Sequence, residues 1–426
     1  MNKTMLFLFL SISLADCSGN KKADGKYPVI DIVNSIGNYQ RVYCSDLFSS
    51  IELIPLETKD DCLIAKVPFP SIILTDNFIF MNSQFGKQQL YAFDGSGKFL
   101  NLIGRNGQGP GEYIFSNNSF LNTDKPTIFV EDTKHILEYD FMGNHIRSFK
   151  HISEEGFWLE NYAYAGDGVF IADTYYNGKN PFKYYLVDSN GVIIKSFPNH
   201  IFYSKIGAWR TNDEGALTPL HVNDRVYLKD VLNDTVYVLK NMELQPAYVF
   251  ELGKYTYPLE TLESFEGHGS QRSLLVSAIR FSTAPGTFVV TEKFIFYYVL
   301  LPEAVPKPKA KPRYRPLTNQ KASDDMPVYG IYGIDKQTNT LLDTDDYFQK
   351  GIVNDLNGGL PFIPIYYAGN NLLVGIWWAD DMKETLTEKY FANQTIKDPQ
   401  AYQKLKELLK TLKDDDNPVV VVAKLK

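Results

Sequence analysis

The ten residues Gly104–Tyr113, GRNGQGPGEY, separate two copies of one β-strand unit and decide the fold. Each copy has a strand, a tight turn containing Asp, and a return strand. The copies are Leu90–Leu100 (LYAFDGSGKFL), Ile136–Ile146 (ILEYDFMGNHI), Tyr184–Ile194 (YYLVDSNGVII) and Ile331–Leu341 (IYGIDKQTNTL). The turn residues Asp94, Asp140 and Asp188 are 46 and 48 residues apart. Short strands repeated every ~40–50 residues are typical of β-propeller blades.

Two strand patterns at the ends of the chain predict how such a ring closes. Ile51–Glu57 precedes the first full blade, and Val419–Leu425 ends the chain. An open ring leaves unpaired sheet edges, so the first and last strands of a propeller normally share one blade. We therefore predict an all-β fold, a six-bladed β-propeller over residues 46–426, in which the N- and C-terminal strands close the ring. The content of 28 Tyr and 28 Phe suits the broad faces between blades.

Two insertions interrupt the predicted blades. Residues 301–328 alternate Pro with Lys and Arg, a pattern that cannot form a strand ladder and predicts an extended loop. Residues 383–413 are predicted to be helical, because Asp398 is a good N-cap and Pro399 suits the first helical position. The apolar residues that follow have helical spacing, so we expect an amphipathic helix packed beside the last blade.

The first residues predict export. Residues 1–17 have a basic start, an apolar run too short to span a bilayer, and Cys17 in a lipobox-like setting, Leu14–Cys17 (LADC). Cys17 is therefore a predicted lipid anchor, while a secretory signal cleaved nearby is the alternative, because Asp16 stands where a small residue is usual. Residues 18–45 are predicted to be a tether and N-terminal segment. The expected location is the periplasm or the outer membrane, with membrane contact through the lipid anchor only.

Three motifs resemble a known family. The opening Glu52–Thr58 (ELIPLET), the motif Gly107–Tyr113 (GQGPGEY) and the stretch Asn354–Phe362 (NDLNGGLPF) look like the six-bladed β-propeller lipoproteins of Gram-negative anaerobes. The blades are also similar to NHL repeats, in which a Gly-rich junction precedes each inner strand. The resemblance implies the fold and the envelope location. It implies no catalytic residues.

The glycine motif supplies the first candidate ligand-binding residues, Arg105, Gln108 and Glu112, which can line a mouth of the central channel. A phosphate cradle is disfavoured, because such a motif opens a helix, and here Pro110 and a strand pattern follow. The alternative is a tight junction between blades. The Asp turns lack the alternating oxygen ligands of a calcium loop and are predicted to be hairpin turns.

The other candidates are amides, carboxylates and indoles. Asn354 and Asp355 can bind a hard cation or sugar hydroxyls if their loop faces the channel, with Asp355 as the candidate metal ligand; otherwise they cap a blade junction. Trp158, Trp209 and Arg210 can stack on or hydrogen-bond to a sugar.

Cys44 and Cys62 remain in the exported chain. In an oxidising compartment they can form a disulfide, and buried free thiols are the alternative.

The function predicted from these features is a binding or protein-interaction module, with a glycan, a peptide or an envelope protein as partner. Its alternative is a calcium-dependent hydrolase or lyase that uses the channel; an inverting glycosidase would need two carboxylates about 6.5–9.5 Å apart. No cofactor is expected other than calcium in the alternative. A net charge of -7 gives no reason to expect a nucleic-acid partner.

Overall fold

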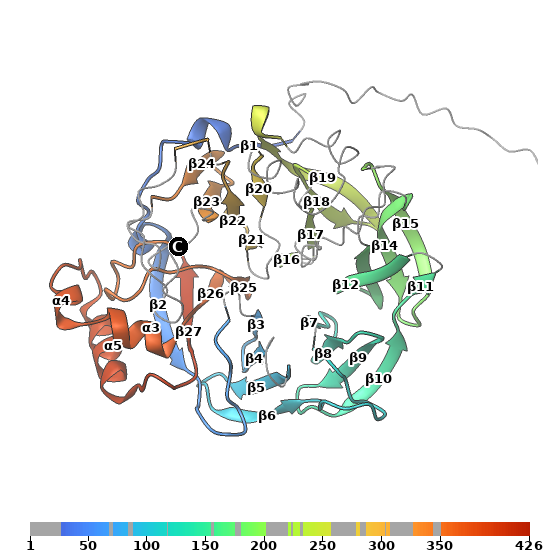
Figure 1. Cartoon of the computed structure of the whole chain (residues 1–426), viewed down its shortest axis with the longest axis horizontal. Helices are drawn as coiled ribbons and strands as arrows, with labels where there is room; N and C mark the ends of the chain where they lie inside the picture. Colours follow the sequence, from blue (N-terminus) through green and yellow to red (C-terminus); the bar gives the residue numbers. More distant parts are fainter. Residues whose placement is uncertain are drawn as a thin grey trace, which may run out of the picture.

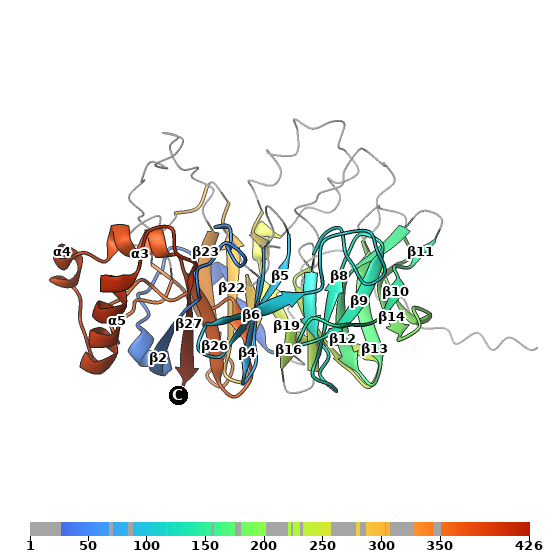
Figure 2. The same cartoon turned by 90° about the horizontal axis from the view of Figure 1, so that it is seen from below.

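A computed structural model shows six sheets arranged around a central axis (Figures 1 and 2). It describes residues 27–67, 71–83, 88–116, 118–154, 157–174, 180–201, 220–222, 225–230, 233–256, 278–281, 287–302, 304–306, 327–343 and 351–426. Within these residues each sheet has four or five strands, and neighbouring strands run antiparallel apart from one added parallel strand. The predicted six-bladed β-propeller is confirmed.

The first three blades follow one another along the chain, each from an inner to an outer strand. The first has β3 (Ser71–Leu74), β4 (Phe78–Asn82), β5 (Leu90–Asp94) and β6 (Phe99–Ile103). The second has β7 (Asn118–Leu121), β8 (Thr127–Glu131), β9 (His135–Asp140) and β10 (His145–Lys150). The third has β11 (Ser153–Glu154), β12 (Phe157–Gly166), β13 (Val169–Thr174), β14 (Phe182–Asp188) and β15 (Ile193–Pro198).

The fourth and fifth blades are less regular. The fourth has β16 (Leu220–Val222), β17 (Arg225–Lys229), β18 (Thr235–Lys240) and β19 (Glu243–Glu251), followed by the 3₁₀ turn η2 (Gly253–Tyr255). The fifth has β20 (Arg280–Phe281), β21 (Phe288–Val290), β22 (Phe294–Leu300), β23 (Pro327–Gly333) and β24 (Thr338–Leu341). Both β20 and β21 pair with β22.

The sixth blade joins the two ends of the chain. Its strands are β25 (Tyr366–Tyr367), β26 (Leu372–Trp377), β27 (Val419–Leu425) and β2 (Phe48–Pro55), in that order. The strand β2 pairs antiparallel with β27, so that Leu53 lies opposite Val421. This pairing gives the C-terminal strand a partner on both edges, as predicted.

Residues before β2 also pack on the ring. The strand β1 (Val29–Asp31) adds to the outer edge of β19, and the 3₁₀ turn η1 (Val33–Ser35) follows it. The chain then passes the fifth blade, where Gln40 forms a bridge with Leu342, and reaches the short helix α1 (Cys44–Leu47). The N-terminal segment from β1 to α1 thus covers the outer edges of the fourth and fifth blades before it enters the sixth.

The predicted helical insertion lies outside the ring beside the sixth blade (Figure 1). It comprises α3 (Ala379–Thr385), α4 (Glu388–Phe391) and α5 (Pro399–Thr411). Asp398 accepts hydrogen bonds from the backbone N–H groups of Gln400 and Ala401, which confirms it as the N-cap of α5. Leu405 on α5 is fully buried in the core.

Alternation along the strands places side chains on both neighbours of each blade. On β4, Ile79 and Met81 pack towards the sixth blade, while Phe80 packs towards the second. The packing between the second and third blades is rich in aromatic rings such as Phe129 and Phe170, whose centroids are 5.1 Å apart. Between the third and fourth blades, the described buried side chains are mostly aliphatic.

The repeated Asp residues form turns, as predicted. Asp94 Oδ1 accepts hydrogen bonds from the N–H groups two and four residues later, at 2.9 and 3.0 Å. Asp140 and Asp188 repeat this arrangement. In Asp188 these backbone hydrogen bonds lower the pKa of the carboxyl.

The alternating strands give the ring two different faces. Each blade begins at its inner strand, so the connections between blades and the loops between second and third strands lie on one face. We call this the connection face. The Asp turns lie on the opposite face, because each joins the last two strands of its blade.

Candidate functional site

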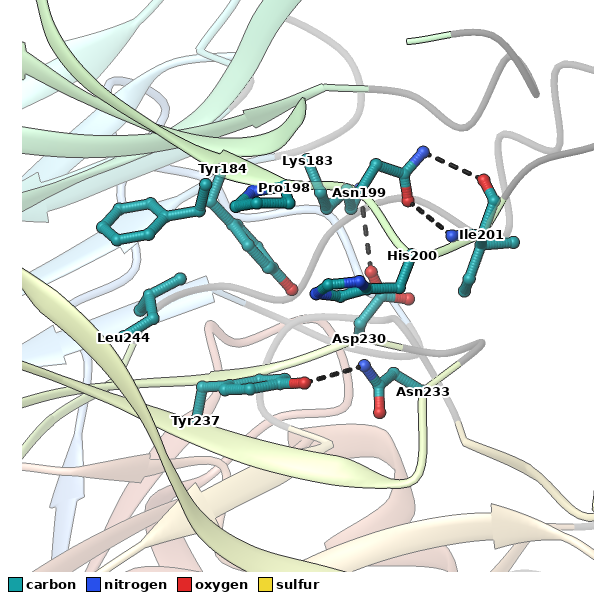
Figure 3. A pocket seen from close by; sticks show the side chains of 11 residues that line it. Lys183, Tyr184, Pro198, Asn199, His200, Ile201, Asp230, Asn233, Tyr237 and Leu244 are labelled. Atoms are coloured by element: carbon teal, nitrogen blue, oxygen red, sulfur yellow. Dashed lines mark hydrogen bonds and ion pairs between the residues drawn. The ribbon is translucent and has the colours of Figure 1, made fainter. Parts of the chain in front are cut away.

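A cavity of about 130 Å³ lies between the third and fourth blades at the connection face (Figure 3). Its walls come from the start of β14, the end of β15 with the residues after it, the end of β17, and the fourth blade's β18 and β19. The lining residues are Lys183, Tyr184, Phe197, Pro198, Asn199, His200, Ile201, Asp230, Asn233, Tyr237 and Leu244. A space walled by two blades with a few polar groups is the usual form of a small-ligand site.

A buried charge cluster forms the inner wall of the cavity. The ammonium of Lys183 lies 3.1 Å from Asp173 Oδ2 and 3.8 Å from Asp230 Oδ2, and it donates a hydrogen bond to the carbonyl of Thr174 at 2.6 Å. All three charged side chains are less than a tenth exposed. Burial raises the pKa of Asp173, although Lys183 opposes this effect. Buried charges of this kind are kept only when paired, so the cluster fixes the two blades relative to each other.

Two amides hold the loops around the cavity. Asn199 donates hydrogen bonds to the carbonyls of Asn180 and Ile201, at 3.1 and 3.0 Å, and accepts one from Ile201 N–H. Asn233 accepts a hydrogen bond from Thr235 N–H at 2.9 Å and donates one to the Tyr237 hydroxyl at 3.2 Å. These bonds use three of the four hydrogen-bonding positions of Asn199 and two of the four of Asn233, and they position the walls.

Three ring-bearing side chains point towards the cavity: Tyr184, His200 and Tyr237 (Figure 3). His200 is exposed and marks the opening to solvent, while both tyrosines are partly buried. Burial, with the charges of Asp230 and Asp173 next, raises the pKa of Tyr184, so its hydroxyl stays protonated. Apolar surface comes from Phe197 and Leu244. The site therefore combines hydrogen-bonding groups with an apolar wall.

Lys229 is buried directly behind the cavity. Its ammonium donates hydrogen bonds to the carbonyls of Asp230 and Asn233, and it lies 3.7 Å from the centroid of the Phe281 ring. Burial lowers its pKa to about 7. Lys229 thus ties the cavity wall to the fifth blade.

The predicted residues of the glycine motif lie on the connection face between the first and second blades. Arg105 and Gln108 are exposed. The carboxylate of Glu112 accepts a hydrogen bond from Gly109 N–H at 2.9 Å. A Cβ atom added to Gly107 would lie only 1.9 Å from Glu112 Oε2 and would clash with it. The glycines therefore allow the Glu112 side chain to fold over its own loop. Whether these residues bind a ligand stays a prediction.

Asn354 and Asp355 are both buried. The carboxylate of Asp355 accepts hydrogen bonds from Ser45 N–H and Ser45 Oγ, at 2.8 and 2.6 Å, and pairs with Lys397 at 2.9 Å. Although burial opposes it, hydrogen bonding by Ser45 and Lys397 lowers the pKa of Asp355. Asp355 thus joins the N-terminal segment to the helical insertion near the outer strand of the sixth blade. Its candidate metal role stays a prediction.

Trp158, at the start of β12, is 52% exposed on the connection face. Trp209, Arg210 and the predicted anchor Cys17 lie outside the described residues, as does most of the Pro-rich segment 301–328. The stacking roles of Trp158, Trp209 and Arg210 therefore stay predictions.

Cys44 and Cys62 are free thiols in the structure and both are fully buried. They belong to separate parts of the core, Cys44 beside the fifth and sixth blades and Cys62 beside the first and sixth. The structure thus shows the two buried thiols that the sequence left as the alternative to a disulfide.

The cavity residues were not found from the sequence. The sequence feature that could have indicated them is a charged residue within an apolar strand pattern. Lys183 lies between Phe182 and Tyr184, and Lys229 ends β17 and is followed by Asp230. Their contact depends on the packing of neighbouring blades, which the spacing of a single repeat does not reveal.

Fold and site together define a six-bladed β-propeller with a two-blade cavity on one face. The chain belongs to the family described as Domain of unknown function (DUF4934), whose model matches residues 27–424. No curated protein matches the sequence significantly.

Two solved structures from Bacteroides share the fold. A Bacteroides fragilis protein whose name proposes that it is exported has a TM-score of 0.63 and 18% identity, covering 93% of this chain and 99% of that chain. A member of the duf4221 family from Bacteroides vulgatus has a TM-score of 0.50 and 11% identity, covering 89% and 97%.

Two kinds of feature are absent from the described part of the chain: membrane-spanning helices and clusters of metal ligands. None of its helices has the length and apolar character needed to cross a membrane. No group of three or more His, Cys, Asp or Glu side chains among the described residues is arranged to hold a metal ion. The calcium-dependent alternative therefore has no observation in its favour and stays a prediction.

Proposed function

We propose that this protein is an extracytoplasmic binding module that holds part of a glycan or a peptide in the cavity between its third and fourth blades. The observation that carries the proposal is the cavity itself, which opens at the exposed His200 and is backed by the charge cluster of Lys183. Propellers commonly bind ligands on one face, where loops of several blades meet.

Two further observations support an extracytoplasmic location. The sequence begins with an export pattern that ends at Cys17. The Bacteroides fragilis protein with the same fold has a name that proposes export. We propose that Cys17 carries the lipid anchor. In a Gram-negative host, Cys17→Ser is expected to move the protein from the membrane fraction to the soluble fraction, and unchanged membrane association would show that the anchor lies elsewhere.

The binding proposal is tested by filling the cavity. Glycan and peptide arrays first identify a retained ligand, and isothermal titration then compares variants. Leu244→Trp places a large ring in the cavity, and His200→Trp covers its opening. Leu100→Trp is the matched control, since Leu100 is exposed on the outer strand of the first blade.

Both cavity variants are expected to weaken binding at least tenfold, while the control binds as the parent does. Equal binding by all variants would place the ligand elsewhere on the propeller. Thermal unfolding of each variant checks that a loss of binding is not a loss of fold; His200→Trp, at an exposed position, keeps the test valid if Leu244→Trp is unstable.

A further inference from the structure

We infer that the cavity between the third and fourth blades binds an uncharged sugar ring, a pyranose. This inference rests on the proposed binding function. Three properties of the cavity lead to this class of ligand: charged groups that already have partners, a mixture of hydrogen-bond donors and acceptors, and its size.

The charges in the wall already have partners. Lys183 lies between the carboxylates of Asp173 and Asp230, at 3.1 and 3.8 Å, so that each carboxylate faces a cation. A second cation, Lys195, lies 5.3 Å from the centroid of the Phe197 ring, which is part of the wall. A charged ligand group would lose its hydration on entering the cavity. It would find no unpaired ion among the described residues of the wall, because Lys183, Asp230 and the nearby Lys195 all have partners of opposite charge. The cavity therefore disfavours anionic groups, and a basic group would have to compete with Lys183 for the same carboxylates.

The polar groups at the opening suit hydroxyls. His200 places an imidazole at the opening, and this ring has two nitrogens that can take part in hydrogen bonds. The Tyr237 hydroxyl accepts a hydrogen bond from Asn233 at 3.2 Å and keeps its own proton to donate. A sugar hydroxyl donates one hydrogen bond and accepts others, so it matches groups of this mixed type, whereas an ammonium group only donates and a carboxylate only accepts.

The remaining wall is apolar. Phe197 and Leu244 face the same space as the rings of Tyr184 and Tyr237. A pyranose has a face of C–H groups and an edge of hydroxyls, and this division corresponds to an apolar wall opposite a polar one. A phenyl side chain of a peptide would fill the apolar part but would offer no hydrogen bond to the Tyr237 hydroxyl or to His200.

The volume corresponds to part of one ring. The cavity measures about 130 Å³, and an engineered cavity of about 150 Å³ in another protein binds benzene. Because a pyranose with its hydroxyls is larger than benzene, the cavity holds one side of the ring, and the other side faces the opening. The exposed side chains of Pro198 and His200 leave the opening accessible to solvent. The rest of an oligosaccharide can therefore extend outwards, so that the cavity holds a terminal or branching residue.

The test measures binding of four probes to the full chain by saturation-transfer NMR and titration calorimetry. The probes are neutral oligosaccharides, oligosaccharides that contain uronic acids, neutral peptides and lysine-rich peptides. Neutral oligosaccharides are expected to bind, with saturation transfer concentrated on one sugar ring. Tyr237→Phe, which removes one hydroxyl, is expected to weaken their binding about three- to tenfold.

His200→Ala is expected to weaken binding to a similar degree. His145→Ala is its control, because His145 is exposed on the second blade and lies outside the cavity. If peptides or uronic-acid sugars bind in preference to neutral sugars and are sensitive to these substitutions, the sugar class is wrong while the proposed binding function stands. If no probe binds, or if binding is insensitive to Tyr237, His200 and Leu244, the cavity is not the ligand site and both proposals fail.

Discussion

Replacement of Lys229 by methionine is expected to change how the stability of the protein depends on pH. The side chain is 1% exposed, and burial lowers its pKa from 10.5 to about 7. At about 1.4 kcal/mol for each pKa unit, this difference corresponds to roughly 5 kcal/mol between the charged and neutral forms.

The direction follows from proton linkage. Between pH 7 and 10.5 the unfolded chain keeps the Lys229 proton while the folded protein releases it, so stability rises with pH over this interval. The contribution of Lys229 to this rise between pH 7 and pH 10 is about 3–4 kcal/mol. Lys229→Met has a side chain of similar length, packs against the Phe281 ring and cannot titrate, so it lacks this part of the rise.

Guanidinium unfolding at pH 7, 8, 9 and 10 measures the effect. The free energy of unfolding of the variant minus that of the parent is expected to fall by about 3–4 kcal/mol from pH 7 to pH 10. Other titrating groups affect both proteins alike and cancel in this difference. Lys240→Met is the control, since Lys240 is exposed at the end of β18, and its difference should not change with pH. If the two pH profiles of Lys229→Met and the parent are parallel, the reasoning about Lys229 is refuted.

Three other perturbations test the fold. Gly104→Ala is expected to lower the free energy of unfolding by about 2–4 kcal/mol, because Gly104 has a φ of +67° and an added Cβ would lie 2.7 Å from a tyrosine ring. The control is Gly37→Ala, at a φ of +80° with no atom within 4 Å of the added Cβ. It should cost only the backbone strain of about 1–2 kcal/mol, as measured by chemical unfolding. Deletion of 419–426 leaves β2 and β26 without their shared partner and should abolish the cooperative thermal transition, whereas a retained transition would contradict ring closure. With Cys44 and Cys62 buried as free thiols, reducing agent should not change the melting temperature, and a drop of several degrees would indicate a disulfide.

The fold could be predicted because its determinants are local. The Asp turns recur because one side chain satisfies two backbone N–H groups, as at Asp94, whatever the rest of the ring does. The N-cap at Asp398 is equally local. The packing of residues 27–45 on the ring could not be predicted in the same way, because β1 pairs with a strand more than two hundred residues away, and the sequence indicated only a tether.

The cavity could not be predicted because it is a property of two blades. The sequence directed attention to residues of unusual composition, such as the glycines and Asn354 with Asp355, and the structure shows local hydrogen bonds for Glu112 and Asp355. The cavity residues are ordinary strand residues. Tyr184 and Tyr237 are among many tyrosines in strands, and only the packing of β14 beside β18 makes them neighbours.

Comparison of two neighbouring blade contacts explains why the cavity lies where it does. Between the second and third blades, Glu131 at the end of β8 reaches across and accepts hydrogen bonds from the N–H groups of Asn161 and Tyr162, at 2.9 and 3.1 Å. At the end of β13 the corresponding acid is the shorter Asp173, and among the described residues Lys183 links it to Asp230 of the fourth blade. A lysine between two carboxylates is a longer link than a direct hydrogen bond to the backbone, and the buried core beneath it is mostly aliphatic. The Asp173–Lys183–Asp230 link between these two blades thus borders the space that we propose a sugar occupies.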